Sequence, residues 1–230
     1  MTDRRLAGLP RPLASYVDHT LLKPEATGDD VRRLLDEAAG AGFAAAMVPP
    51  CWVALAAERL AGSAVAPATV VAFPFGYAAP AVRVAESERA VEDGARELDT
   101  VINLSLVKGG DYQQAGDDLA GWVLAMRALD PGVVLKVIVE TALLEDEEKR
   151  RLAELVAACG AEYVKTSTGF APGGATVDDV RLLAGVVAGR CKVKASGGIR
   201  DLETALAMIE AGADRLGTSS AVQILRQAGR

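Results

Sequence analysis

Short apolar segments alternate with longer segments of helical periodicity along the chain. In residues 27–41, apolar side chains recur at the i, i+3, i+4 and i+7 positions of a helix with one buried face, from Val31 to Ala38, and Thr27 is placed to cap it. The next segment, residues 43–48, is apolar without interruption, as in a strand that is covered on both faces. These segments predict one helix followed by one buried strand.

The same alternation continues to the C-terminus and predicts eight strands, each followed by a helix. The predicted strands cover residues 16–20, 43–48, 69–73, 97–103, 133–140, 163–167, 192–195 and 214–217. The predicted helices cover residues 27–41, 52–60, 79–93, 112–129, 144–159, 176–188, 202–211 and 219–227. Gly-Ala pairs recur before several strands, which indicates that one strand–helix unit is reused.

Eight such units in 230 residues favour a (β/α)8 barrel, whose usual length is about 250 residues. The alternative is a doubly wound open sheet, which normally carries a glycine-rich fingerprint after its first strand; none follows residues 16–20. We therefore predict an α/β TIM barrel, with residues 1–230 as its single domain. Catalytic residues of such barrels lie at the C-terminal ends of the strands.

Composition excludes several classes of function. A net charge of −6 argues against a nucleic-acid-binding surface, and no apolar run is long enough to predict a membrane span. The N-terminus lacks the apolar region of a signal peptide, and the scattered Cys51, Cys159 and Cys191 fit a reducing cytoplasm. His19 is the only histidine, so we expect neither a zinc site nor another metal or cofactor.

Two predicted strands carry a lysine near their C-terminal ends. Lys165 precedes a turn at Gly169, and Lys194 precedes the glycine pair Gly197-Gly198. The two strands are successive, so these amines, the lysine pair, are expected to lie side by side in a barrel. A lysine attacks a carbonyl only as the neutral amine, and both burial and a neighbouring cation lower its pKa from about 10.4. The pattern therefore indicates an imine-forming lysine.

Asp99 also lies inside an apolar strand segment, where a carboxylate needs a cationic partner. In the catalytic interpretation it moves protons through a water molecule and holds a lysine cation. Lys136 lies in another predicted strand, and for this lysine a structural salt bridge with Asp99 is the favoured interpretation. The alternative for the lysine pair is exposure to solvent, or structural pairing with Asp99 or Glu140.

Glycine and serine residues flank the ends of the last predicted strands. Glycines let backbone N–H groups approach an anion, and barrels often bind phosphate after strands seven and eight. An imine-forming lysine beside a phosphate site suggests carbon–carbon bond chemistry on a small sugar phosphate. The candidate phosphate-binding residues are Gly169, Gly197, Gly198, Gly217, Ser219 and Ser220.

Six segments, in order along nearly the whole chain, resemble the deoxyribose-phosphate aldolase family. They are residues 18–24 (DHTLLKP), 97–99 (ELD), 135–141 (LKVIVET), 164–169 (VKTSTG), 193–200 (VKASGGIR) and 217–220 (GTSS). The resemblance implies a metal-free class I aldolase, a lyase on a (β/α)8 barrel. Such enzymes reversibly cleave 2-deoxy-D-ribose 5-phosphate to D-glyceraldehyde 3-phosphate and acetaldehyde, in deoxyribonucleotide catabolism.

By matching segment, the resemblance implies that Lys165 is the Schiff-base nucleophile, Lys194 the lysine that lowers its pKa, and Asp99 the proton donor and acceptor. The six glycines and serines named above would hold the phosphate. Three features depart from the family pattern. Met47 stands where a cysteine is frequent, Phe170 stands where some members have a basic residue, and the C-terminal tyrosine of some members is missing. These departures bear on aldehyde inhibition, phosphate affinity and proton transfer.

Two other functions fit the same residues. One is an imine-forming barrel aldolase with a different donor or acceptor, and the other is an inactive barrel that binds a sugar phosphate. The joint presence of the lysine pair and Asp99 argues against the inactive barrel. The expected partner is a small sugar phosphate, with neither nucleic acid nor membrane. A homodimer is the working hypothesis for the assembly.

Overall fold

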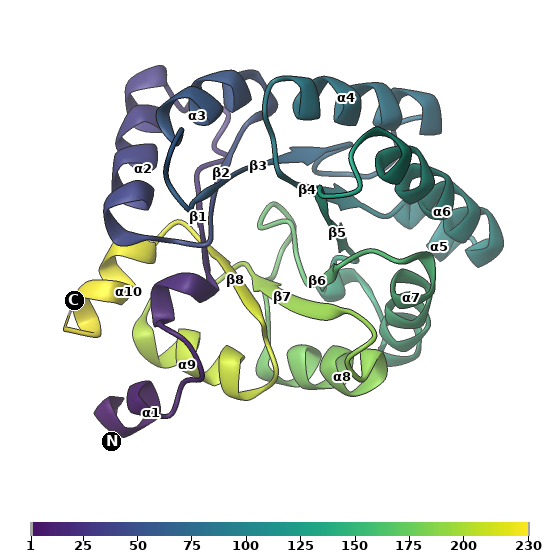
Figure 1. Ribbon diagram of the computed structural model, residues 1–230. Coiled ribbons are helices and arrows are strands. Elements are labelled where there is room, and N and C mark those ends of the chain that lie inside the picture. Colours follow the sequence, from purple (N-terminus) through teal and green to yellow (C-terminus); the bar gives the residue numbers. More distant parts are fainter. Residues whose placement is uncertain (1, 230) are drawn as a thin grey trace.

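Eight parallel strands form a closed barrel surrounded by helices in the computed structural model, which describes residues 2–229 (Figure 1). Each strand pairs with the next along the chain, and β1 pairs with β8 to close the sheet. This closure confirms the predicted (β/α)8 barrel and excludes the open sheet. The strands are β1 (Val17–Thr20), β2 (Ala45–Val48), β3 (Ala66–Val71), β4 (Glu97–Val101), β5 (Val134–Ile138), β6 (Tyr163–Lys165), β7 (Lys192–Ser196) and β8 (Arg215–Thr218).

Helices cover the outside of the barrel (Figure 1). The α-helices are α1 (Thr2–Ala7), α2 (Gly28–Ala41), α3 (Val53–Arg59), α4 (Pro80–Glu92), α5 (Leu104–Lys108), α6 (Tyr112–Leu129), α7 (Asp146–Cys159), α8 (Val177–Val187), α9 (Leu202–Glu210) and α10 (Ala221–Gln227). Three short 3-10 helices are η1 (Leu13–Tyr16), η2 (Pro50–Trp52) and η3 (Thr141–Leu143). Among residues 2–229, no helix combines the length and the apolar character that a membrane crossing needs.

Most predicted elements are present, with differences at their ends. Helix α6 has the predicted bounds, and Thr27 caps α2 as predicted, accepting a hydrogen bond from the N–H of Asp30 at 3.3 Å. The prediction missed α5, whose five residues are too few to display a helical period. Its cap is Asn103, which had been assigned to the preceding strand; the Asn103 side chain accepts from the N–H of Ser105 at 3.1 Å.

The two faces of the sheet differ in character. Side chains alternate between the faces of a strand, and the outer face packs beneath the helices with fully buried residues such as Leu98, Leu135 and Val164. The inner face of β2 and β3 is also apolar and carries Met47 and Val70. Elsewhere the inner face is largely charged. The uninterrupted apolar pattern of residues 43–48 is therefore confirmed for β2, whereas in β4 to β8 apolar residues gather on the outer face.

The loop after β3 packs closely against the end of β4. Gly76 adopts a left-handed backbone with φ of 74°, and a Cβ atom there would overlap the carbonyl oxygen of Ile102. Buried Arg83 of α4 links this loop to β4, because its guanidinium donates to the carbonyl oxygens of Gly76 at 3.0 Å and Val101 at 3.3 Å. Gly76 is therefore required both for its conformation and for its lack of a side chain.

We expect Gly76→Ala to lower the free energy of unfolding by about 3 kcal/mol or more, because the methyl group collides with backbone. Gly62 is a matched control, since it has φ of 79° but nothing within 4 Å of an added Cβ. Gly62→Ala should lower the free energy of unfolding by about 1 kcal/mol, the conformational penalty alone. Urea denaturation followed by circular dichroism measures both. Equal losses would show that the close approach at Gly76 is unimportant.

Candidate active site

The barrel interior brings together Lys165 of β6, Lys194 of β7 and Asp99 of β4. Lys165 and Lys194 are register partners on adjacent strands. Asp99 Oδ2 accepts hydrogen bonds from Lys165 Nζ at 2.8 Å and from Lys194 Nζ at 2.7 Å. All three side chains are at most 4% exposed, so the lysine pair does not extend into solvent. Both amines face one carboxylate at the heart of the barrel.

Lys136 of β5 forms the salt bridge that the sequence favoured. Its ammonium lies 2.7 Å from Asp99 Oδ1 and 2.7 Å from Glu97 Oε2. Asp99 and Glu97 outweigh burial and raise the pKa of Lys136 above its ordinary value. Lys136 therefore keeps its proton and does not compete with Lys165 as a nucleophile.

Sequence reasoning missed three further charged groups inside the barrel. Asp18 of β1 accepts hydrogen bonds from Lys194 Nζ at 2.5 Å and from Arg215 Nη1 of β8 at 2.6 Å. Arg215 also lies 3.3 Å from Glu97 Oε2. A signal for each was present, because each is a charged residue within a short strand, the same feature that singled out Asp99. Applying that test to every strand would have found them.

The charged groups inside the barrel do not balance in number. Among the groups within residues 2–229 that these ion pairs join, the acids are three and the basic groups four, so pairing each acid with a cation leaves one amine over. The extra amine is Lys165, whose only ion-pair partner within residues 2–229 is Asp99, a carboxylate also shared with Lys136 and Lys194. We call this set the ion network: Asp18, Glu97, Asp99, Lys136, Lys165, Lys194 and Arg215.

Burial and the neighbouring charges together set the pKa values of these groups. Burial lowers the pKa of Lys165 to about 8, and the ammonium groups of Lys194 and Lys136 act in the same direction against the opposing charge of Asp99. Burial alone would raise the pKa of Asp99, but the three lysines outweigh it and hold that pKa well below the usual range. Burial would also raise the pKa of Asp18, but the charges of Lys194 and Arg215 outweigh it and lower that pKa. Lys165 therefore changes charge at a pH close to neutral.

Lys165 opens into a hollow of about 410 Å³ at the C-terminal mouth of the barrel. Ser220 is not part of this lining, and its N–H donates to Thr218 Oγ1 at 2.9 Å. Lys23 and Arg200, two exposed cations that the sequence reasoning did not assign to the site, also border it. The structure thus brings five of the six predicted phosphate-binding residues to this hollow: Gly169, Gly197, Gly198, Gly217 and Ser219.

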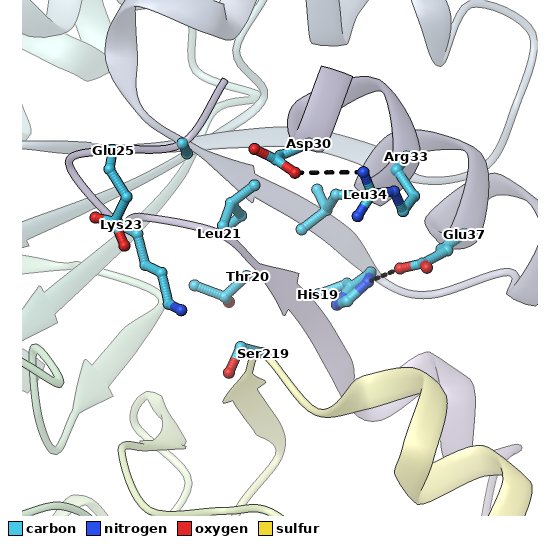
Figure 2. A pocket seen from close by; sticks show the side chains of 11 residues that line it. His19, Thr20, Leu21, Lys23, Glu25, Asp30, Arg33, Leu34, Glu37 and Ser219 are labelled. Carbon is cyan, nitrogen blue, oxygen red and sulfur yellow. Dashed lines mark hydrogen bonds and ion pairs between the residues drawn. The ribbon is translucent and has the colours of Figure 1, made fainter. Parts of the chain in front are cut away.

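A second hollow of about 440 Å³ lies between the end of β1 and helix α2 (Figure 2). His19 points toward α2, where its Nε2 lies 2.7 Å from Glu37 Oε2 (Figure 2). Asp18 precedes it in the strand and faces the opposite way, into the ion network. In the segment at 18–20 it is therefore Asp18, and not the histidine, that reaches the site.

The chain was compared with known families and proteins. The model of the family described as DeoC/LacD family aldolase matches residues 13–227. A deoxyribose-phosphate aldolase from Desulfitobacterium hafniense (strain DSM 10664 / DCB-2) is 52% identical over 213 residues, covering 93% of this chain and 97% of that protein. One from Thermococcus gammatolerans (strain DSM 15229 / JCM 11827 / EJ3) is 50% identical over 218 residues, covering 94% and 96%.

Solved structures agree with these sequence matches. A deoxyribose phosphate aldolase from Aeropyrum pernix, described as a unique tetramer, has a TM-score of 0.89 and 36% identity, covering 99% of this chain and 96% of its own. An aldolase called QR15 has a TM-score of 0.88 and 42% identity, covering 94% and 95%. Both similarities extend over almost the entire barrel.

We expect imine formation between Lys165 and a small aldehyde to increase with pH around a midpoint of about 8. Lys194→Met removes a neighbouring cation and leaves the network with as many acids as bases, so Lys165 should retain its proton to higher pH. The midpoint should rise by about 1 pH unit or more. Borohydride trapping across a pH series measures it. Lys192→Met, which removes an exposed lysine of the same strand, is the control and should leave the midpoint unchanged. An unshifted midpoint in Lys194→Met would contradict the role of Lys194.

Proposed function

This chain belongs to the DeoC/LacD aldolase family, and from that premise we propose that it is a deoxyribose-phosphate aldolase acting through an imine on Lys165. It reversibly cleaves 2-deoxy-D-ribose 5-phosphate to D-glyceraldehyde 3-phosphate and acetaldehyde. The observation that carries this proposal is the position of Lys165, a buried amine with a lowered pKa that opens into a hollow bordered by glycines and cations.

The reaction begins with attack of the neutral Lys165 amine on C1 of the open-chain aldehyde. At pH 7 a lysine with a pKa of about 8 is neutral in about one molecule in ten, against about one in three thousand for an ordinary lysine. Loss of water from the adduct gives an iminium ion, which draws electrons toward the nitrogen. Lowering the pKa thus raises the reactive fraction several hundredfold without removing the positive iminium that the next step needs.

Cleavage follows when Asp99, through a water molecule, accepts the proton of the C3 hydroxyl. The C2–C3 bond breaks, its electrons pass to the iminium to give an enamine, and glyceraldehyde 3-phosphate leaves. The pKa of Asp99 is held low by the three lysines, so the carboxylate passes the proton on rather than retaining it. The enamine is protonated at C2, and hydrolysis releases acetaldehyde and regenerates Lys165.

The phosphate binds at the mouth of the hollow. Gly197, Gly198 and Gly217 border it, where the lack of a side chain lets an anion approach the backbone, and the exposed cations Lys23 and Arg200 supply positive charge. These two cations offset the absence of a basic side chain at Phe170.

We also infer that residues 1–230 act as a single aldolase domain and that the enzyme works in the cytoplasm. The three free cysteines support a reducing compartment. A homodimer stays the working hypothesis for its assembly.

Borohydride reduction in the presence of acetaldehyde should add an ethyl group to Lys165, because burial lowers the pKa of this amine and it borders the hollow. Peptide mass spectrometry locates the label, and Lys165→Arg should abolish it. Labelling of Lys194 or Lys136 would make the assignment wrong. Labelling with pyruvate or dihydroxyacetone in place of acetaldehyde would indicate a different imine-forming aldolase, and no labelling with any donor would indicate an inactive barrel.

Asp99→Asn should lower kcat for cleavage by about a hundredfold or more, because the C3 hydroxyl loses its proton acceptor. Acetaldehyde trapping on Lys165 should persist near neutral pH, since loss of the acid favours the neutral amine further. Glu97→Gln removes one acid from the same network without touching Lys165 and is the control. Its kcat should fall much less; equal losses in both variants would show that Asp99 acts only through the total charge.

A further inference from the structure

Glu140 has no part in the reaction described above, yet its geometry is unusual. It follows β5, is 2% exposed, and has φ of 56° and ψ of 66°, a left-handed conformation that residues other than glycine rarely adopt. One of its carboxylate oxygens, Oε1, is buried and has no hydrogen-bond partner within residues 2–229. Both features are unfavourable for stability, and such features are retained where the side chain serves the site.

The other carboxylate oxygen fixes the segment that follows β6. Glu140 Oε2 accepts a hydrogen bond from the N–H of Thr168 at 3.1 Å and a second from the Thr168 hydroxyl. The same hydroxyl oxygen accepts from the N–H of Phe170 at 3.0 Å. One carboxylate thereby determines the main-chain and side-chain positions of Thr168 and, through Thr168, the position of Phe170.

This segment forms one wall of the active-site hollow. Thr168, Gly169 and Phe170 border the hollow beside Lys165, and Gly169 has φ of 86°. The ring of Phe170 meets the ring of Phe73, from the loop after β3, edge to face with centroids 5.3 Å apart. Displacing Thr168 would therefore move the Gly169 amide and the aromatic contact together.

We propose that Glu140 is a positioning residue, which holds residues 168–170 in the conformation that receives the phosphorylated end of the substrate. A carboxylate suits this task, because hydrogen bonds to a charged acceptor are shorter and stronger than those to a neutral one. Glu140 acts through Thr168 and does not touch the imine, which Lys165 forms within the ion network. The inference rests on the proposed function, because it assigns the phosphorylated end of that substrate to this wall.

The test compares two reactions of the same enzyme. Cleavage of 2-deoxyribose 5-phosphate needs the wall formed by residues 168–170, whereas trapping of acetaldehyde on Lys165 needs only the amine. Glu140→Ala and Glu140→Gly both remove the carboxylate, and glycine in addition accepts the left-handed backbone, which protects against a folding defect. Both variants should raise KM for cleavage by about tenfold or more, while the rate of trapping stays within about twofold of the unsubstituted enzyme.

Two further variants sharpen the result. Glu140→Gln keeps an oxygen that can accept both hydrogen bonds, so its KM should lie close to that of the unsubstituted enzyme. Glu147→Ala removes an exposed glutamate from nearby α7 and should change neither reaction. An unchanged KM in Glu140→Gly would overturn the proposal, and so would a parallel loss of cleavage and trapping. Failure of the unsubstituted enzyme to cleave the substrate or to be trapped would instead refute the proposed function.

Discussion

The chemistry of this protein depends on an amine that has no carboxylate of its own. Ions inside a protein must be paired, because burial removes their hydration. Three acids inside the barrel are enough for three cations, and Lys165 is the fourth base. It shares Asp99 with two other ammonium groups, and burial together with those two cations lowers its pKa. Lys165 is thus both the base left without a carboxylate of its own and the buried lysine that borders the hollow.

The barrel creates this arrangement through its register and its two unlike faces. The outer face is apolar and anchors the helices, which leaves the inner face free to carry charge. Within the interior, β2 and β3 present an apolar side, and Val70 of β3 is the register partner of Asp99. Apolar groups beside the ion network keep water away and strengthen each charge interaction. The pKa of Lys165 therefore depends on the neighbouring ions and on the apolar inner face of β2 and β3.

The sequence predicted most elements and the closed barrel, but it did not predict which charged side chains closure brings together. Strand periodicity was enough to bring Lys165, Lys194 and Asp99 to one place, since parallel strands end at the same side of a barrel. It could not pair Asp18 with Arg215, which are 197 positions apart and meet only because β1 closes on β8. Ser220 was assigned to the phosphate site together with Ser219; it follows the lining of the hollow directly, its N–H donates to Thr218 Oγ1, and its role there stays a prediction.

The lowered pKa of Lys165 also carries a consequence for stability. In the unfolded chain this lysine titrates near 10.5, whereas in the barrel it titrates near 8. At and below pH 8 the folded state therefore bears a penalty of about 3 kcal/mol, which is relieved as pH rises from about 8 to 10.5. The carboxylates Asp18 and Asp99 act in the opposite sense, since their lowered pKa values stabilise the fold above their ordinary range and that gain is lost on acidification. The stability that Asp18 and Asp99 contribute through their ion pairs thus offsets the stability lost in making Lys165 reactive, and both effects come from one set of contacts.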